Sequence, residues 1–282
     1  MGTGHPRRQA IRAAVAAAVV TLAACGRSEQ AKGAEALKLT VVGSSTIAPL
    51  MSELAKVYEA DHPGARIDVQ SGGSSRGVTD VRQGTARLGM VSRELKPDES
   101  DLGKLLIAKD GLALIVHKSN PVSALSKEQV VGIYTGSITN WKQVGGQDQP
   151  ISVVSKAEGR STLEIFSHYF GVKYKDIKAQ VVIGDNQQGI QTVSVTPAGI
   201  GYVSIGTAEY EAAHGASIRL ISLDGHVPST QAVAQGSYPI TRELNLVFKP
   251  EHAAELKDLL AAASSDKARA IITGQFFVPT SR

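Results

Sequence analysis

Short apolar runs alternate with amphipathic stretches along most of the chain. The runs have the length and the β-branched content that are typical of strands. They cover residues 37–42, 66–70, 88–91, 112–117, 151–155, 181–183, 200–204, 218–223 and 245–248. The spacing of these runs leaves room for a helix between most of them, which predicts an α/β fold with mainly parallel strands.

Three of the intervening stretches carry helix signals. Apolar residues at helical spacing follow Thr46, namely Ile47, Leu50, Met51, Leu54, Val57 and Tyr58. Ser126 followed by Gln129 forms a capping-box pattern at the start of a helix that we expect to end near Gly136. Leu163, Phe166 and Phe170 form a third apolar stripe.

The first 24 residues differ from the rest. Arg7, Arg8 and Arg12 precede an apolar run at residues 13–20 that is too short to span a membrane, which predicts a secretory signal. The following Leu-Ala-Ala-Cys resembles the lipobox of bacterial lipoproteins, which implies cleavage before Cys25 and lipid attachment to its sulfur. Residues 25–36 then read as a flexible tether, and the folded part is expected outside the cytoplasm.

Composition excludes several classes of function. The chain has 282 residues and one Cys, and its seven His form no metal-ligand spacing, so neither a metal nor another cofactor is expected. The formal net charge is +4, but without residues 1–24 it falls to +1, with 27 Lys and Arg against 26 Asp and Glu. No basic field remains that would favour nucleic acid as a partner.

Clusters of Gly, Ser and Thr follow three of the predicted strands. They lie at residues 43–46 (GSST), 71–77 (SGGSSRG) and 159–162 (GRST). Each places hydroxyls and backbone N–H groups at a helix start, where the helix dipole favours an anion. One such cluster alone is more often a cap and a tight turn. Three of them, with Arg76, Arg93, Lys156 and Arg160 nearby, favour a shared oxyanion site.

The blocks VGSSTIAPL at 42–50, GGSSRGV at 72–78 and GMVSREL at 89–95 resemble the phosphate ABC transporter substrate-binding proteins (PstS-like). Residues 156–162 (KAEGRST) and 199–204 (GIGYVS) are similar to later blocks of that family, in matching order. The resemblance implies a type II periplasmic-binding-protein fold, with two α/β lobes that close on phosphate. It also implies delivery to a membrane permease with its ATPase, and no enzymatic activity.

The expected domain organisation follows from this resemblance. Lobe one takes residues 37–117 and 246–282, and lobe two takes 118–245, with the hinge crossings near 118 and 244. The protein is expected to act as a monomer held to the membrane by its lipid, in a periplasm or on the outer face of the cell membrane.

The family's ligand positions fall on named residues of this chain. They are Ser45, Thr46, Ile47, Ser74, Ser75, Ser92, Arg93, Lys156, Arg160, Ser161 and Thr162. The chain departs from the common family pattern at two of them, with Arg93 where many members have Asp, and Arg160 where many have Ser. Loss of a carboxylate removes a device that selects protonated phosphate over sulfate, and Glu158 is a candidate replacement.

Other interpretations of these residues stay open. Arg93 either donates to the oxyanion or forms an ion pair beside Glu94. The same site could belong to a binding protein for another oxyanion or to a sensor domain. Ser75 lies at the centre of a loose G-x-S-x-G pattern, with His117 and His168 downstream, and the weakest alternative is therefore a serine esterase.

Overall fold

The computed structural model describes residues 37–280 of the chain. The predicted signal at 1–24, the tether at 25–36 and the lipidation site Cys25 lie outside the described residues. No helix within 37–280 combines the length and the apolar character needed to cross a membrane.

Helices and strands alternate through the described residues, as the apolar pattern predicts. In chain order they are β1 (Lys38–Gly43), α1 (Ala48–Asp61), β2 (Arg66–Ser71), α2 (Ser74–Gln83), β3 (Leu88–Val91), η1 (Pro97–Glu99), β4 (Gly103–His117), β5 (Ala124–Leu125), α3 (Lys127–Thr135), η2 (Trp141–Val144), β6 (Ser152–Lys156), α4 (Ser161–Phe170), η3 (Tyr174–Asp176), β7 (Val181–Ile183), α5 (Asn186–Ser194), β8 (Gly199–Ser204), α6 (Ile205–Ala213), β9 (Ile218–Leu223), α7 (Thr230–Ala234), β10 (Thr241–Phe248), η4 (Pro250–His252), α8 (Ala253–Ala263), α9 (Asp266–Gly274) and β11 (Val278–Pro279).

The strands form a curled sheet with two groups of parallel pairs. β1 pairs in parallel with β2 and β3, and β6 pairs in parallel with β7 and β8. The strand order is β2-β1-β3-β10-β4-β8-β6-β7, with β9 and β11 also paired to β4. This arrangement confirms the predicted α/β fold and its parallel strands.

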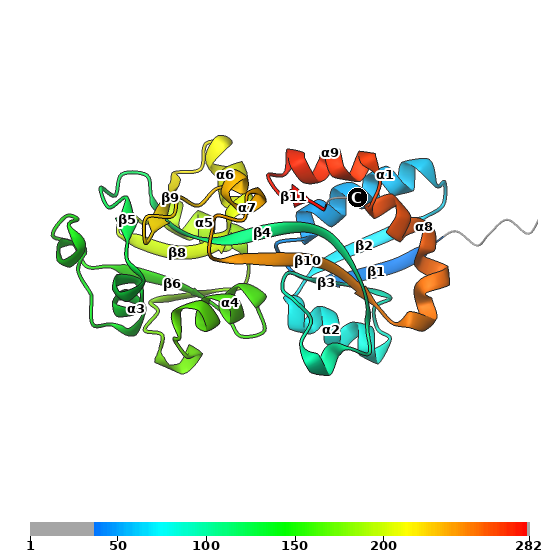
Figure 1. Cartoon of the computed structure of the whole chain (residues 1–282), viewed down its shortest axis with the longest axis horizontal. Coiled ribbons are helices and arrows are strands. Elements are labelled where there is room, and N and C mark those ends of the chain that lie inside the picture. The colour runs from blue at the N-terminus through cyan, green and yellow to red at the C-terminus, as the bar shows by residue number, and fades with distance from the viewer. Residues whose placement is uncertain (1–36, 281–282) are drawn as a thin grey trace, which may run out of the picture. The chain divides into compact units, whose positions relative to one another are not determined.

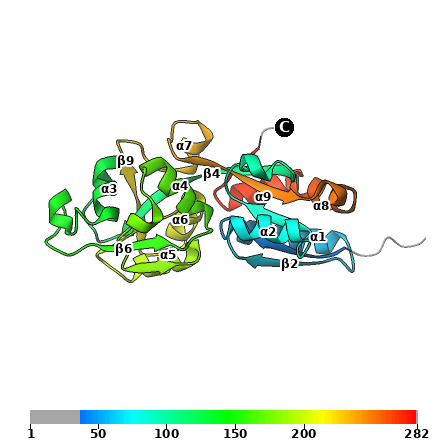
Figure 2. The same cartoon turned by 90° about the horizontal axis from the view of Figure 1, so that it is seen from below.

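Two antiparallel strands, β4 and β10, connect the groups. β4 pairs with β10 from Gly103 to Gly111, and from Leu112 onward its partners are β8 and β9. Figure 1 shows β4 and β10 running side by side between a group with α3 to α7 and a group with α1, α2, α8 and α9, and Figure 2 shows the same two groups from below. We call the group with α1 lobe one and the group with α3 lobe two. The exact lobe boundaries given above stay a prediction.

Each lobe is built on its own apolar core. In lobe one, Leu50, Met51 and Leu54 of α1 pack with the strand residues Val41 and Met90. In lobe two, the rings of Tyr134, Phe166 and Tyr202 pack together with centroids 4.2 to 5.6 Å apart; Phe166 stacks on Tyr202, and Tyr134 is tilted against both. The predicted apolar stripes on α1 and α4 and the capping box of α3 are confirmed. The separate cores leave the junction between the lobes to polar residues.

Gly43 ends β1 at the point where the chain turns toward this junction. Its φ of +145° is unfavourable for other residues, and a Cβ there would lie 2.2 Å from the carbonyl oxygen of Met90. The Gly43 oxygen also accepts hydrogen bonds from Gly72 and Gly73, both at 2.8 Å. Close approach of these backbones brings the turns after β1, β2 and β3 together.

We predict that Gly43→Ala is strongly destabilising because the methyl group would clash with backbone that has no room to move. The control Gly145→Ala is also at positive φ, +83°, but meets nothing within 4 Å. Urea unfolding is expected to show a loss of roughly 3 kcal/mol or more for Gly43→Ala and about 1 kcal/mol for the control. Equal losses in the two variants would contradict this account.

Candidate functional site

Hydroxyl side chains from both lobes meet at the junction and are almost completely buried. We call them the hydroxyl cluster: Ser44, Thr46, Ser74, Ser92, Ser161 and Thr162. None is more than 4 % exposed. They come from the turns after β1 and β3 and from the first turns of α2 and α4. The three Gly/Ser/Thr clusters of the sequence therefore converge on one place.

Hydrogen bonds join the cluster across the lobes. The Ser92 hydroxyl accepts from Ser44 Oγ at 2.7 Å and lies 2.5 Å from Ser161 Oγ. The Ser92 backbone N–H donates to Ser74 Oγ at 3.1 Å. The lobes also touch where Ser75 N–H meets the Gly159 carbonyl at 3.4 Å. Two segments of lobe one, the turn after β3 and the start of α2, thus contact residues at the start of α4 in lobe two, and the turn after β1 joins them through Ser44.

The helix starts at this cluster lack side-chain caps. The N-cap residues that precede α1, α2 and α4 make no side-chain cap hydrogen bond; they are Ile47, Gly73 and Arg160. By contrast, α3 and α9 are capped by Ser126 and Ser265. The hydroxyls of the cluster are therefore not ordinary caps, and the positive ends of the helix dipoles lie beside them.

A buried ion pair lies against the cluster. Arg242 of β10 and Asp110 of β4 are paired in register, and both side chains are 1 % exposed. Arg242 Nε and Nη2 donate to Asp110 Oδ2 at 2.9 and 2.7 Å. Nη1 donates to Thr162 Oγ1 at 3.1 Å, and Nη2 donates to Thr46 Oγ1 at 3.0 Å. One guanidinium thus contacts hydroxyls of both lobes.

Lys156 brings a second buried cationic group. Its Nζ donates to Asn186 Oδ1 at 2.9 Å, and the Asn186 amide donates to Thr46 Oγ1 at 3.0 Å. Burial lowers the pKa of Lys156 well below its ordinary value; Asp185 opposes the shift, and Arg242 adds to it. Within residues 37–280 this ammonium has no ion pair. The charged form of Lys156 is therefore costly in this site, and a bound anion would stabilise it.

Several predicted site residues lie at the edge of the cluster or outside it. Ser45 is half-buried, and Ile47 packs its side chain in the core of lobe one. Ser75 Oγ donates to Glu164 Oε1 at 3.1 Å instead of joining the hydroxyls. Ile47 could contact a ligand only through its backbone.

The two arginines at which the chain departs from the family pattern have other partners than those of Arg242. Arg93 donates to Glu99 through both terminal nitrogens, at 2.7 and 2.8 Å. Arg160 lies over Gly73 and Gly184, where an added Cβ would meet its side chain at 3.0 and 3.4 Å. The guanidinium of Arg93 thus has carboxylate partners, as in the ion-pair alternative. Arg160 has no ion pair within residues 37–280.

The sequence analysis missed four residues of the site: Ser44, Asp110, Asn186 and Arg242. None of the four carried a clear sequence signal: Asp110 and Arg242 lie in strands that contain other charges, and their burial is seen only in the structure. Such charges are rarely buried without a partner. Among the described residues, no group of three or more His, Cys, Asp or Glu is arranged to hold a metal ion.

A family model and a curated relative each match most of the chain. The family described as PBP superfamily domain matches residues 28–267. The phosphate-binding protein PstS of Bacillus subtilis is 31 % identical over 94 % of this chain and 91 % of its own length.

Solved structures point the same way. A putative phosphate ABC transporter substrate-binding protein from Clostridium perfringens, with bound phosphate, has a TM-score of 0.80 at 30 % identity, covering 86 % of this chain and all of its own. An ABC-type phosphate transport receptor from Vibrio cholerae has a TM-score of 0.70 at 31 % identity, with the same coverage.

We predict a pH-dependent effect of Lys156→Met on the stability of the ligand-free protein. Because burial lowers the pKa of Lys156 in the folded state, the unfolded chain binds more protons, and the wild type loses stability as the pH falls below about 10.4, the ordinary Lys value. The Met variant lacks this penalty. Urea unfolding in phosphate-free buffer should show it to be more stable at neutral pH, with the difference vanishing toward pH 10. A less stable variant at neutral pH would contradict the assignment.

Proposed function

The chain belongs to the family of phosphate ABC transporter substrate-binding proteins, and on this premise we propose that it captures inorganic phosphate between its lobes and delivers it to a membrane permease. The ion would be held in the hydroxyl cluster. The two lobes of the protein would close on the ion. A ligand shifts the equilibrium between an open and a closed form only by contacts that differ between these two states.

One observation carries the proposal. Buried hydroxyls from both lobes surround Arg242 and Lys156, while Asp110 is the buried carboxylate that contacts this group. A tetrahedral oxyanion can accept hydrogen bonds from hydroxyls, a guanidinium and an ammonium at once. Of the residues expected from the family resemblance, we propose Thr46, Ser74, Ser92, Lys156, Ser161 and Thr162 as direct ligands, with the backbones of Ser45 and Ile47 beside them.

The remaining predicted residues take other roles in this proposal. Arg160 lies at the rim of the site, where it would contribute positive charge, and Ser75 and Arg93 lie on the neighbouring face between the lobes. Arg242 joins the ligand set because its Nη1 and Nη2 reach Thr162 and Thr46.

Selectivity for phosphate over sulfate requires a group that accepts a hydrogen bond from a protonated oxyanion and repels one that is fully ionised. Glu158, considered above as a replacement carboxylate, is exposed on the surface. Asp110 is the better candidate because it is buried beside Arg242. Its negative charge would disfavour a fully ionised dianion such as sulfate and tolerate an oxyanion that carries a proton.

The cellular setting is part of the proposal. A signal at 1–24 and a lipid on Cys25 would hold the folded part at the membrane surface outside the cytoplasm, where a permease and its ATPase could receive the ion. An esterase is not favoured. In a Ser-His-Asp triad the serine hydroxyl is hydrogen-bonded to a histidine that acts as its base, whereas the Ser75 hydroxyl donates to the carboxylate of Glu164.

We predict selective binding of phosphate by the purified protein. Calorimetric titration is expected to give a 1:1 complex with phosphate that is at least about 100-fold tighter than that with sulfate or molybdate, a difference of about 2.7 kcal/mol. Equal affinity for sulfate would favour the alternative of a binding protein or sensor for another oxyanion. Absence of binding by any oxyanion would contradict the proposal.

Two substitutions test the site. Thr46→Val and Ser74→Ala each remove a buried hydroxyl, and each should weaken phosphate binding about 10- to 100-fold, as expected for the loss of a hydrogen bond to a charged group. Thr192→Val is the control, because its hydroxyl donates to the Gln188 carbonyl within α5 and takes no part in the hydroxyl cluster. Calorimetry with unfolding curves as a folding check measures the outcome. Unchanged affinity in both site variants would show that the ion binds elsewhere.

A further inference from the structure

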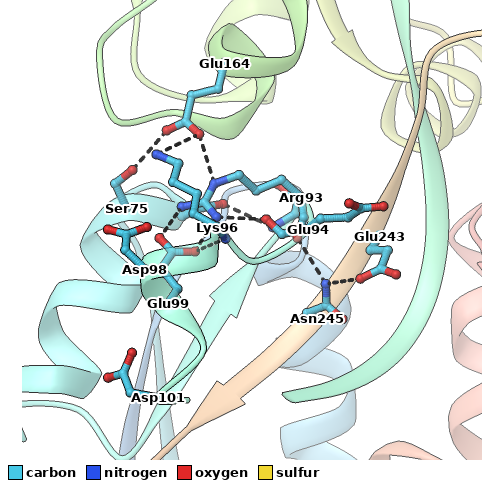
Figure 3. Close-up of polar contacts among 12 residues, drawn as sticks. Ser75, Arg93, Glu94, Lys96, Asp98, Glu99, Asp101, Glu164, Glu243 and Asn245 are labelled. Carbon is cyan, nitrogen blue, oxygen red and sulfur yellow. Dashed lines mark hydrogen bonds and ion pairs between the residues drawn. The ribbon is translucent and has the colours of Figure 1, made fainter. Parts of the chain in front are cut away.

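A second set of polar contacts joins the lobes beside the hydroxyl cluster, and Glu164 is at its centre (Figure 3). Glu164 lies in the first turn of α4, in lobe two. Its Oε1 accepts from Ser75 Oγ of lobe one at 3.1 Å. Its Oε2 lies 2.9 Å from Arg93 Nε and 3.4 Å from Lys96 Nζ, both of lobe one. One carboxylate of lobe two thus meets three side chains of lobe one.

Lobe one holds its side of this contact in place without help from lobe two. Arg93 forms a two-pronged hydrogen bond with Glu99 and a further bond to the Glu94 carbonyl at 2.9 Å. Glu99 Oε2 also accepts from the Lys96 backbone N–H at 2.9 Å. The Arg93 carbonyl accepts from the Asn245 amide at 3.0 Å. The guanidinium is therefore oriented before Glu164 arrives.

The charges on the two sides are complementary. Lobe one presents two cations to Glu164: Arg93, which is also paired with Glu99, and Lys96, whose one ion pair within residues 37–280 is with Glu164. Arg93 makes no hydrogen bond through Nε, so that Glu164 reaches it only as an ion-pair partner. Moving the lobes apart would leave the Nε side of a guanidinium that is 7 % exposed without its carboxylate.

The strength of this contact lies between two limits. Exposed ion pairs contribute little because water screens them, whereas breaking a fully buried pair is costly. Arg93 is buried, but the Glu164 side chain is 29 % exposed and Lys96 is 49 % exposed. A moderate effect is therefore expected, large enough to alter the rate of lobe opening and too small to hold the lobes closed alone.

We propose that Glu164 is a positioning residue that latches lobe two onto Arg93 and Lys96, and thereby slows release of the bound ion without contacting it. This inference rests on the proposed capture of phosphate between the lobes. It also gives Arg93 a role, since an arginine after Ser92 supplies the lobe-one partner of the latch.

Glu164→Gln tests the latch, because it removes the charge and keeps the shape of the side chain. The variant should release radiolabelled phosphate about tenfold faster than the wild type in a chase experiment and bind it correspondingly more weakly, with little change in the association rate. Added salt should reduce the difference in release rate between the wild type and Glu164→Gln, because salt screens the ion pairs. Small-angle X-ray scattering of the ligand-free protein should show a more open average form for the variant.

Glu128→Gln is the matched control. Glu128 lies in the first turn of α3 in the same lobe and is exposed, so its substitution removes the same charge from the first turn of a helix. Release at the wild-type rate is expected. If Glu128→Gln also speeds release, the effect comes from net charge or from the helix dipole, and the latch is contradicted.

A second variant keeps the test valid if Glu164→Gln folds poorly. Lys96→Met removes the more exposed partner and should speed release by a smaller factor, and its effect should be less than additive with that of Glu164→Gln. Wild-type release rates in both variants would overturn the latch while leaving phosphate capture intact. If the wild type binds no phosphate, the proposed function fails, and the scattering comparison still decides on the latch.

Discussion

The buried ion pair between Arg242 and Asp110 is the constraint on which the rest of the site depends. Two charges inside a protein are tolerated only when their remaining hydrogen-bonding groups are satisfied. Here Asp110 Oδ1 accepts from the Gly206 N–H at 3.1 Å, and the free guanidinium N–H groups donate to Thr46 and Thr162. Satisfying this pair therefore requires β4, β10 and both lobes to be in place together.

Much of the fold could be predicted because apolar patterning is local information. The predicted strands at 88–91, 181–183 and 218–223 coincide with β3, β7 and β9. The hydroxyl-rich turns at the ends of β1 and β6 also stood out in the sequence. Strands that are buried in a parallel sheet read as short apolar runs, and the turns after them collect Gly, Ser and Thr for reasons that each segment carries by itself.

The crossing strands could not be predicted in the same way. The first half of β4 contains Lys104, Lys109 and Asp110, and β10 begins with Arg242 and Glu243, so the charges hide the apolar pattern. Their pairing becomes visible only when strands more than a hundred residues apart lie in register. The contact between Arg93 and Glu164 could not be predicted either, because the two residues are distant in the chain and no spacing rule connects them.

The proposed ligand contacts and the proposed latch are carried by the same segments. On α2, Ser74 belongs to the hydroxyl cluster and Ser75 contacts Glu164. After β3, Ser92 belongs to the hydroxyl cluster and Arg93 contacts Glu164. On α4, Ser161 and Glu164 are three residues apart and therefore lie on one face of the helix. A movement that brings Ser161 to Ser92 must also bring Glu164 to Arg93. In the proposed mechanism, closure around an ion and closure of the latch are therefore one motion, and each makes the other more favourable.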